Sequence, residues 1–348
     1  DANGGTGGTG PTPTPYGSSI SAPSVSRTGY TFSHWSPTVP ATMPAANSTY
    51  TAQWTPITYT VKYNGNGSTG GSTSDSTHTY DQSKALTLNG FTKTGHTFAG
   101  WATSAGGAVV YADGQSVSNL ANTQGATVNL YAKWTVNQYT ISYQSNGGTP
   151  VSSNTVDYGT QISAPTAPTR TGYIFAGWYT DAGLTNAVSW PYTVTANATF
   201  YAKWTAITYT VAYNGNGSTG GSTASSSHTY DVSKALTANG FSKTGYTFAG
   251  WNTAANGSGT SYSDQQSVQN LTTTNGATIN LYAQWTINQY TISFNSNGGS
   301  AVTSITQNYG TQASEPTQPT KSGYKFDGWF SDVGLTQAVS WPYTIGAS

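Results

Sequence analysis

A short aromatic block recurs along this chain, and it constrains the fold more than any other feature. The block reads Gly-aromatic-x-Phe-x-x-Trp, and a second block that ends in Trp follows every copy but the last. Regular self-similarity of this kind indicates a tandem array of small units rather than one large core. The first block runs from Gly29 to Trp35, Gly95 to Trp101, Gly172 to Trp178, Gly245 to Trp251 and Gly323 to Trp329, and the second from Tyr50 to Trp54, Tyr131 to Trp134, Tyr201 to Trp204 and Tyr282 to Trp285.

The repeats come in a long form and a short form that alternate. A long repeat opens with Ile-Thr-Tyr-Thr-Val at Ile57 and again at Ile207, whereas a short repeat opens with Asn-Gln-Tyr-Thr-Ile at Asn137 and at Asn288. Very few residues separate one repeat from the next, which predicts a semi-rigid array. The predicted units are 1–54, 55–134 (long), 135–204 (short), 205–285 (long) and 286–348 (short).

Within a repeat, the pattern of side chains has the period of a β-strand. In the segment 59–63, Tyr-Thr-Val-Lys-Tyr, apolar and polar residues alternate, as they do in a half-buried strand. Asn-Gly pairs such as Asn66-Gly67 favour positive φ and indicate turns between strands. Further strands are predicted at 78–80 and 97–101, and the segments 83–86 and 233–236 could form one helical turn at most. We therefore predict a mainly β chain.

Composition excludes several classes of function. Charged residues are only 6% of the chain and the net charge is zero, so the basic surface that binds nucleic acid is absent from the sequence. The lack of cysteine excludes disulfides and thiolate metal sites. No apolar run is long enough to cross a bilayer as a helix, and we predict no membrane insertion. Aromatic residues, at 13%, are the candidate source of stability for such short units.

The repeated Phe and Trp residues are therefore predicted to form the core of each repeat. Phe98 and Trp101 differ in strand parity, so one of the two is expected to face outward at a bulge near Gly100. Trp190 and Trp341 occur only in short repeats, in Val-Ser-Trp-Pro-Tyr, and are predicted to lie at the surface, at contacts between repeats or at a ligand. The predicted core residues are Phe98, Trp101, Trp134, Phe175, Trp178, Trp204, Phe248, Trp251, Trp285, Phe326 and Trp329.

No constellation of residues points to catalysis or to a metal. His78 and His228 are equivalent positions of the two long repeats, and neither has a second histidine at ligand spacing. Asp81, Asp157 and Asp231 stand beside tyrosines at turns and are predicted to cap them. We therefore expect no catalytic residue, no metal site, no cofactor and no enzymatic activity.

The order of motifs resembles one known family. Tyr139-Thr-Ile-Ser-Tyr, then Val156-Asp-Tyr-Gly-Thr, then the segment from Ala164 to Trp178, then Ala198-Thr-Phe-Tyr-Ala-Lys-Trp, is similar to the internalin-type B-repeat, or Listeria–Bacteroides repeat. The resemblance covers nearly the whole chain and implies small β-grasp-like units in a secreted or surface-anchored bacterial or archaeal protein. It implies a stalk, spacer or adhesin segment and transfers no catalytic residues. Insertions near 102–115 and 252–266 depart from the family pattern.

The two end repeats are predicted to be incomplete. Asn3-Gly4-Gly5 matches Asn146-Gly147-Gly148, so repeat 1 lacks a first strand, and repeat 5 stops at the equivalent of residues shortly after Trp190, so it lacks a last strand. One interpretation is a window from a longer array, where neighbouring repeats supply the strands. The other is a filament in which successive subunits complete one another head to tail by strand complementation.

We therefore predict a non-enzymatic, extracellular structural repeat protein of the cell surface. Its expected role is a stalk, spacer or fibre-forming segment of an adhesin. The alternative is a module that binds glycans or host proteins through exposed aromatic residues. Self-association or neighbouring repeats are the expected partners, with no role for nucleic acid.

Overall fold

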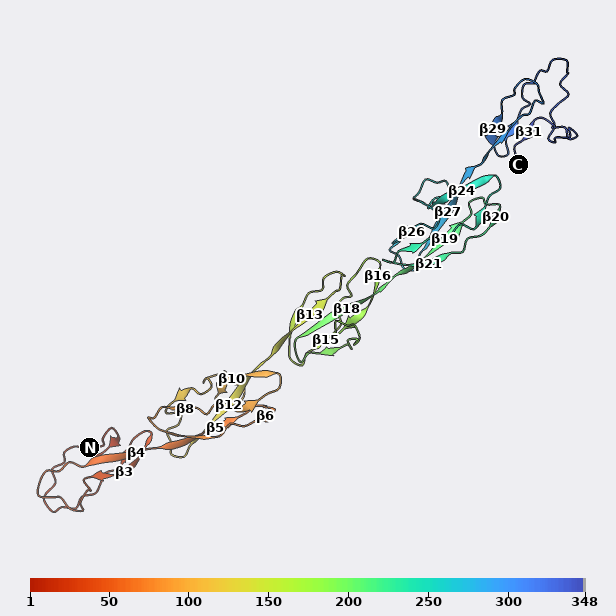
Figure 1. Ribbon diagram of the computed structural model, residues 1–348. Helices are drawn as coiled ribbons and strands as arrows, with labels where there is room; N and C mark the ends of the chain where they lie inside the picture. Colours follow the sequence, from red (N-terminus) through yellow and green to blue (C-terminus); the bar gives the residue numbers. More distant parts are fainter. Residues whose placement is uncertain (347–348) are drawn as a thin grey trace. The chain divides into compact units, whose positions relative to one another are not determined.

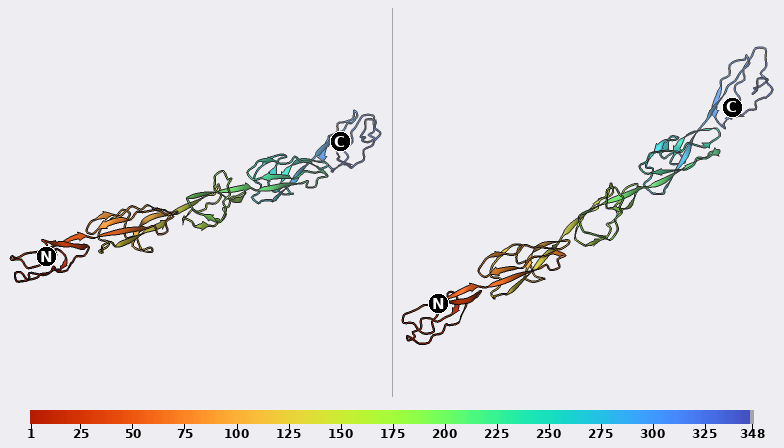
Figure 2. Two further views of the ribbon diagram at one scale, coloured as in Figure 1. Left: turned by 90° about the horizontal axis from the view of Figure 1, so that it is seen from below. Right: turned by 60° about the horizontal axis from the view of Figure 1, so that its bottom comes forward.

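The computed structural model describes residues 1–346, which form strands, turns and loops without a helix (Figures 1 and 2). The predicted mainly β fold of tandem repeats is confirmed. The chain divides into two compact units whose boundary runs through repeat 3. The first unit comprises Asp1–Ser142, Ser152–Ala164 and Ser189–Thr199, and the second comprises Tyr143–Val151, Pro165–Val188 and Phe200–Ser348.

In the first unit, repeat 2 is built on one mixed sheet in the order β10-β12-β5-β7. β5 pairs parallel with β12 and antiparallel with β7, and β10 lies antiparallel to β12. Two minor pairs, β6 with β9 and β8 with β11, lie in the connecting segments. This arrangement is β-grasp-like. The strands are β5 (Thr58–Asn64), β6 (Gly70–Gly71), β7 (Ser76–Thr79), β8 (Lys84–Ala85), β9 (Phe91–Thr92), β10 (His96–Ala102), β11 (Ser116–Val117) and β12 (Thr127–Val136).

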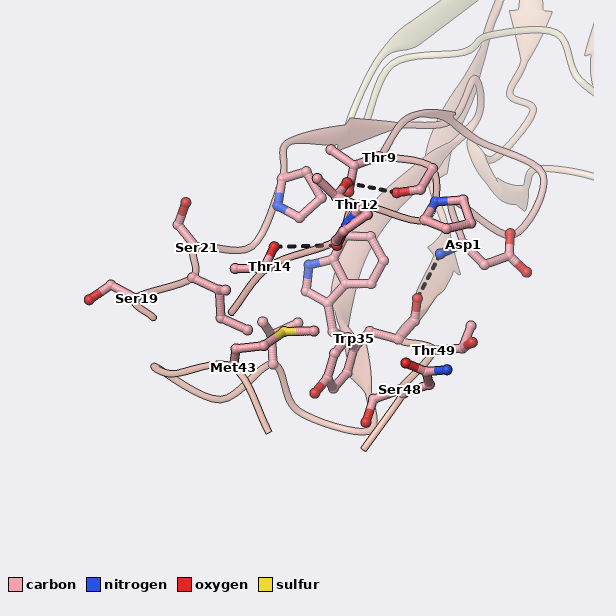
Figure 3. A pocket seen from close by; sticks show the side chains of 18 of the residues that line it. Asp1, Thr9, Thr12, Thr14, Ser19, Ser21, Trp35, Met43, Ser48 and Thr49 are labelled. Carbon is pink, nitrogen blue, oxygen red and sulfur yellow. Dashed lines mark hydrogen bonds between the residues drawn. The ribbon is translucent and has the colours of Figure 1, made fainter. Parts of the chain in front are cut away.

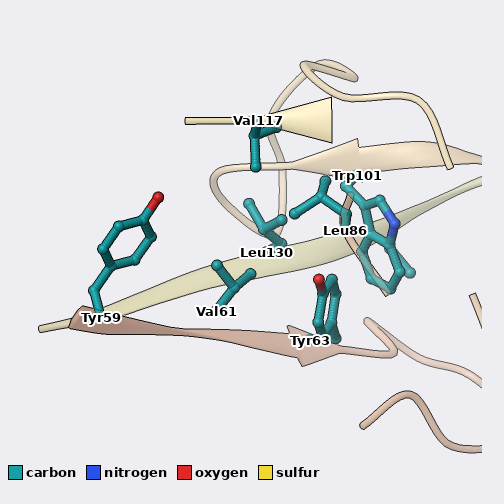
Figure 4. Close-up of a cluster of buried hydrophobic side chains, with 8 residues drawn as sticks. Tyr59, Val61, Tyr63, Leu86, Trp101, Val117 and Leu130 are labelled. Carbon is teal, nitrogen blue, oxygen red and sulfur yellow. The ribbon is translucent and has the colours of Figure 1, made fainter. Parts of the chain in front are cut away.

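The core of repeat 2 lies on one face of this sheet, as the alternation along β5 requires. Tyr59, Val61 and Tyr63 are buried, while Thr60 and Lys62 between them point to the opposite face. The connecting segments close the core from the other side with further apolar side chains (Figure 4). The other buried members of this cluster are Leu86, Trp101, Val117, Leu130 and Ala132.

A β-bulge turns both aromatic residues of the repeated block toward the core, where Trp101 is buried and Phe98 packs against it. The register between β10 and β12 shifts between Phe98 and Gly100, and Gly100 has a φ of 139°. The extra residue of the bulge turns Phe98 and Trp101 to the same face of the sheet, although their spacing in the sequence would place them on opposite faces of a regular strand. The rings of Phe98 and Trp101 consequently meet at 5.0 Å between centroids. The expectation that one of them faces outward is wrong.

In the second unit, repeat 4 reproduces repeat 2 with one added edge strand. Its sheet has the order β21-β19-β27-β24-β25. The segments 83–86 and 233–236, where one helical turn was conceivable, instead carry the short strands β8 and β22. The strands of repeat 4 are β19 (Thr208–Asn214), β20 (Gly220–Gly221), β21 (Ser226–Thr229), β22 (Lys234–Ala235), β23 (Phe241–Ser242), β24 (Tyr246–Asn252), β25 (Ser261–Tyr262), β26 (Ser267–Val268) and β27 (Thr278–Ile287).

Repeat 3 contains equivalent strands. In the first unit β13 pairs antiparallel with β14, and β15 pairs with β17. In the second unit β16 pairs antiparallel with β18 and carries the same bulge, between Phe175 and Gly177. The strands are β13 (Gln138–Gln144), β14 (Asn154–Asp157), β15 (Gln161–Ile162), β16 (Tyr173–Tyr179), β17 (Tyr192–Thr193) and β18 (Ala198–Ala206).

The end repeats contain fewer strands. In repeat 1, β3 and β4 form a two-stranded sheet whose register places Thr51 where Tyr131 lies in repeat 2, so Tyr50 takes the place of Leu130. In repeat 5, β28 pairs with β29. The strands are β1 (Thr6–Gly7), β2 (Val25–Ser26), β3 (Tyr30–Ser36), β4 (Thr51–Pro56), β28 (Gln289–Ile292), β29 (Ile305–Asn308), β30 (Gln312–Ala313) and β31 (Tyr343–Thr344).

Candidate functional site: the junctions between repeats

A single residue connects the last strand of each repeat to the first strand of the next. The backbone passes from β4 to β5 through Ile57, from β12 to β13 through Asn137, from β18 to β19 through Ile207 and from β27 to β28 through Asn288. The last strands run two residues past the recurrent Trp, so one residue separates the last strand of a repeat from the first strand of the next. These four connections are the places where one repeat can position the next.

Each connecting residue is hydrogen-bonded on both sides. The N–H of Ile57 donates to the carbonyl of Gly29 at 3.0 Å, and the carbonyl of Ile57 accepts from the N–H of Tyr80 at 3.0 Å. The same two bonds recur at Ile207, and at Asn137 and Asn288 with distances of 2.8–2.9 Å. Because both backbone groups of the connecting residue are paired, its rotation is restricted in every junction.

A glycine and a tyrosine from adjacent repeats meet at each junction. Gly29 has a φ of 78°, which favours glycine, and a Cβ added there would overlap the ring of Tyr80. The equivalent pairs are Gly95 with Tyr158, Gly172 with Tyr230, and Gly245 with Tyr309. The first glycine of the repeated block therefore has a specific purpose: it leaves room for a tyrosine of the following repeat.

The short-to-long junctions, between repeats 1 and 2 and between repeats 3 and 4, add a polar network. The hydroxyl of Tyr30 donates to Oδ2 of Asp81 at 2.7 Å across the junction. Asn119 holds the same aspartate, because its Nδ2 donates to Oδ1 of Asp81 at 2.8 Å while its Oδ1 accepts from the Asp81 N–H at 2.6 Å. The guanidinium of Arg27 lies 3.9 Å from the Tyr30 ring centroid.

The second short-to-long junction repeats this network almost unchanged. Tyr173 donates to Oδ2 of Asp231 at 2.8 Å, Asn270 donates to Oδ1 of the same carboxylate at 2.8 Å, and Arg170 lies 3.8 Å from the Tyr173 centroid. Asp81 and Asp231 have left-handed backbones, with φ of 59° and 60°. Their side chains thus bind the preceding repeat, rather than only capping a turn as predicted.

Hydrogen bonding shifts the pKa values of these groups in opposite directions. The hydrogen bond from the Tyr30 hydroxyl, followed by that from Asn119, holds the pKa of the Asp81 carboxyl below its usual value. Donating this bond to Asp81 raises the pKa of the Tyr30 phenol. At Asp231 the largest cause of the lowered pKa is Asn270, followed by Tyr173. The carboxylates are therefore ionised, and the phenols protonated, at neutral pH.

The long-to-short junctions, between repeats 2 and 3 and between repeats 4 and 5, lack the carboxylate. Gly159 and Gly310 follow the junction tyrosine where Asp81 and Asp231 stand in the other type. The connecting asparagine instead accepts a side-chain bond, from Thr97 Oγ1 to Asn137 Oδ1 at 2.6 Å and from Thr247 to Asn288 at 2.6 Å. The two junction types hold the same backbone path with different side-chain chemistry.

Four of the predicted core tryptophans are buried, and the other predicted core residues are half-buried. Trp101 and Trp251 are fully buried, and Trp178 and Trp329 are 3% and 9% exposed. The Trp residues of the second block are half-buried and donate their indole N–H to the turn after the first strand, as in the 2.9 Å bond from Trp134 to the Gly65 carbonyl. Phe98, Phe175, Phe248 and Phe326 are half-buried and contact the Trp of their own block, and Trp204 and Trp285 bond to Ser145 and Gly215.

The other sequence candidates lie away from the junctions. Trp190 and Trp341 are half-buried, and the Trp341 ring lies 6.2 Å from that of Phe294 in its own repeat. His78 and His228 are buried, and Nε2 of each is within 3.0 Å of the hydroxyl of Ser76 or Ser226. Among residues 1–346, no three His, Cys, Asp or Glu side chains gather in a way that could hold a metal ion.

One recurrent signal in the sequence escaped notice. A cation stands two residues before the junction glycine in all five repeats, at Arg27, Lys93, Arg170, Lys243 and Lys321. Arg27, Arg170 and Lys321 donate to the carbonyl of the asparagine in the turn after the first strand, and four of the five cations lie over the aromatic residue that follows the glycine. With so few charges in the chain, this regular placement was a detectable pattern.

The fold and its junctions define a tandem array of small β-repeats. The chain belongs to the Listeria–Bacteroides repeat family: the family's repeat domain matches residues 1–55, 59–133, 139–203, 209–284 and 290–346. The described residues contain no helix with the length and apolar character needed to cross a membrane.

Three curated relatives share these repeats. A protein of Evansella cellulosilytica named as a Gly-rich membrane protein is 32% identical over 337 residues, or 90% of this chain and 37% of that protein. A second protein of the same organism, named as a membrane protein, is 37% identical over 215 residues, or 60% of this chain and 30% of that protein. Internalin H of Listeria monocytogenes is 36% identical over 107 residues, 30% of this chain and 17% of internalin H. The chain thus spans well under half the length of each relative.

Proposed function

We propose that this chain is a non-enzymatic structural segment of an extracellular, cell-surface protein, in which the junctions fix each repeat relative to its neighbour. The observation that carries this proposal is the single connecting residue, paired on both sides and enclosed by a glycine–tyrosine contact, in all four junctions. Such connections suit a stalk or spacer that must keep a defined length. The relatives named as membrane proteins and as an internalin support a location at the cell surface.

Distance measurements between neighbouring repeats test the spacer proposal. The chain has no cysteine, so spin labels can be placed on exposed positions by Ala182→Cys in repeat 3 and Val232→Cys in repeat 4. Pulsed dipolar spectroscopy should give a narrow distance distribution in the parent. Tyr230→Ala should broaden it, because the ring that covers Gly172 is lost. Tyr16→Ala, at a tyrosine that is 78% exposed, is the matched control. A parent distribution as broad as that of Tyr230→Ala would contradict the proposal.

A second candidate function, self-association by strand addition, rests on a groove in repeat 1. The groove has a volume of about 1330 Å³ and is lined by Ile20, Trp35, Met43 and Tyr50 among others (Figure 3). Asp1 lies at its end, where its carbonyl accepts from the N–H of Ala52 on β4 at 2.9 Å. In repeat 2 the same edge of the last strand carries the first strand in parallel.

The complete repeats indicate what would fill this groove. In repeat 3 the last aromatic residue of the first strand, Tyr143, contacts Trp178 at 5.1 Å and Phe200 at 5.9 Å. Trp35 and Tyr50 are the corresponding residues of repeat 1. We propose that a strand of the form aromatic-x-aliphatic-x-aromatic occupies the groove, from preceding repeats in a longer chain or, head to tail, from a second copy in a filament.

A fusion distinguishes the two sources of the strand. Adding Gln-Tyr-Thr-Ile-Ser-Tyr, the sequence of 138–143, directly before Asp1 should fill the groove in cis and raise the stability of repeat 1. If second copies otherwise supply the strand, the same fusion should also abolish filaments that the parent forms at high concentration in electron microscopy. A monodisperse parent at all concentrations argues against the head-to-tail source, and an unchanged stability of repeat 1 argues against the groove as a strand site.

Binding of glycans or of a host protein is a further proposal, favoured by the two loop tryptophans Trp190 and Trp341. A glycan array with the parent and with the Trp190→Ala and Trp341→Ala variants tests it. Loss of a bound glycan in the variants would support the adhesin role. Binding that survives both substitutions, or no binding by the parent, would count against it.

A further inference from the structure

The second strand of each of repeats 2 to 5 is an outer strand next to the first strand. In an antiparallel pair, alternate residues direct both backbone groups toward the partner and the residues between direct them away. The N–H of Thr60 bonds to the Ala126 carbonyl on the β12 side of β5, so Thr60 points away from β7. Its cross-strand partner Thr77 consequently directs its backbone groups to the open edge. By the same register, the backbone groups of the equivalent residues point to the open edge in the other repeats: Thr155 in repeat 3, Ser227 in repeat 4 and Thr306 in repeat 5.

The long repeats block this edge with a lysine. Nζ of Lys84 donates to the Thr77 carbonyl at 2.7 Å, and Nζ of Lys234 donates to the Ser227 carbonyl at 2.7 Å. Each lysine begins a short strand seven residues further along the chain. A charged side chain on an exposed edge prevents another strand from pairing with it. The two long repeats thus carry an identical protection of their edges.

The short repeats have no such block. Gln161 and Gln312 begin β15 and β30, where Lys84 and Lys234 begin β8 and β22. Within residues 1–346 no hydrogen bond reaches the outward backbone groups of Thr155 or Thr306, and both threonines are exposed. The open edges of β14 and β29 are therefore available for a further strand.

We propose that β14 and β29 are lateral docking edges for a second copy of this chain, which pairs through its own short-repeat edge in antiparallel orientation. Hydrogen-bonded pairing must join outward-directed residues, which are Thr155 and Asp157 in β14 and Thr306 and Asn308 in β29. The register that places Thr155 opposite Asp157 of the second copy overlaps the full length of both strands and keeps the two carboxylates apart. In this register the Asp157 carbonyl, which already accepts from the N–H of Thr160 at 3.2 Å, accepts through its second lone pair. Pairing β14 with β29 likewise sets Asp157 opposite a threonine.

The chemistry of the edge favours a second copy over an unrelated peptide. The strand is short and polar, and its own sequence pairs hydroxyl with carboxylate in the permitted register. The chain has zero net charge, so approaching copies do not repel one another. One such edge makes few bonds and is weak alone, and two edges per chain can act together when both engage. This contact is independent of the groove in repeat 1.

The experiment transfers the lysine between repeat types. The variant Gln161→Lys/Gln312→Lys blocks the short-repeat edges, and Lys84→Gln/Lys234→Gln opens the long-repeat edges. The control, Ala182→Lys/Val333→Lys, adds the same two charges to exposed loop positions of the same repeats. Sedimentation equilibrium over a concentration series gives the association constant, and hydrogen exchange reports the amides of Thr155 and Thr306 at low and high concentration.

The parent should self-associate, with slower exchange of the Thr155 and Thr306 amides at high concentration. The blocked variant should associate at least about fivefold to tenfold more weakly, which corresponds to the loss of roughly one hydrogen bond in all. The opened variant should associate more strongly than the parent, and the control should match the parent apart from a salt-dependent effect of charge. Equal weakening in the blocked variant and the control, or exchange at Thr155 and Thr306 that is independent of concentration, would overturn the proposal.

Discussion

Repeats 2 and 3 place different groups at the same position of the same hairpin. In repeat 2, His78 of β7 lies opposite Tyr59 of β5, whereas in repeat 3 Val156 of β14 lies opposite Tyr139 of β13. His78 is fully buried and its ring stacks on Tyr59, with 5.6 Å between centroids. The long repeats therefore bury an ionisable group where the short repeats have none, and the two types should respond differently to acid.

The histidine ends a partly buried chain of hydrogen bonds. The N–H of Thr87 donates to the Tyr63 hydroxyl, which is 3.1 Å from Ser76 Oγ, and Ser76 Oγ is 3.0 Å from Nε2 of His78. Nδ1 of His78 has no partner among the described residues, and the same is true of His228 in repeat 4. Since one ring nitrogen is left unpaired, the imidazolium cannot satisfy both of its N–H groups without opening the repeat.

The largest effect expected from a single change is the loss of the core tryptophan. Trp251→Ala should lower the free energy of unfolding of repeat 4 by about 3–5 kcal/mol, the usual cost of deleting a buried Trp side chain. Trp178→Ala should cost a similar amount, because Trp178 is also buried, and Trp329→Ala less, because its ring is the most exposed of the three. Repeat-resolved hydrogen exchange measures each cost. A smaller loss for Trp251→Ala than for Trp329→Ala would contradict the prediction that the more buried ring contributes more to the stability of its repeat.

Acid should destabilise the long repeats and leave the short ones nearly unchanged. Burial, and secondarily Lys84, lowers the pKa of His78 below its ordinary value, and burial with Lys234 does the same at His228. Below about pH 6.5 the unfolded state binds a proton that the folded state does not, so stability falls with pH until the folded pKa is reached. The slope is at most about 1.4 kcal/mol per pH unit for each histidine, and it applies while the unfolded state alone is protonated.

Hydrogen exchange of each repeat between pH 7.5 and pH 5, corrected for the intrinsic exchange rate, measures this loss. His78→Val gives repeat 2 the residue that stands at 156 in repeat 3, and it should remove the acid sensitivity of repeat 2 alone. Repeat 4 in the same molecule keeps His228 and serves as the internal control. Equal acid sensitivity of repeats 2 and 3 in the parent would show that the buried histidine is not its cause.

The sequence predicts the architecture well because the physics that specifies it is local. Alternation in Tyr59–Tyr63, Asn-Gly turns and the recurrent Trp positions were sufficient for the strands and the repeats. The inward position of both Phe98 and Trp101 required a bulge whose exact effect on parity depends on the partner strand. The junctions join residues that are distant in sequence, such as Gly29 and Tyr80, so periodicity could not reveal them.

A matched pair of substitutions separates two effects at the junction glycine: the contact with the tyrosine ring and the cost of the left-handed backbone. Gly95→Ala should cost the roughly 1–2 kcal/mol of a left-handed non-glycine residue, plus the displacement of the Tyr158 ring. Gly159→Ala bears the same backbone cost, since its φ is 80°, but a Cβ there meets nothing within 4 Å. Thermal unfolding compares the two variants. An equal cost would show that the tyrosine yields freely and does not hold the junction.

The smallest expected effect distinguishes the two junction types. Asp231→Asn removes the charge that accepts from Tyr173 and Asn270 at the repeat 3–4 junction, and it should widen the distance distribution between labels at 182 and 232. Because these groups are exposed, the stability of each repeat should barely change. As the pH falls through the lowered pKa of Asp231, the parent should approach the variant, since the carboxylate that stabilises the contact becomes protonated.

The matching test at a long-to-short junction uses Asn288→Ala, which removes the acceptor of the Thr247 hydroxyl between repeats 4 and 5. Labels at Val232→Cys and Val333→Cys report that junction, and its distribution should broaden without any dependence on pH below 5, because the connection contains no carboxylate. A pH-dependent width at the repeat 4–5 junction, or none at the repeat 3–4 junction, would mean that the backbone bonds of the connecting residue alone set the geometry. The aspartate and asparagine networks would then add little to the geometry of the junctions.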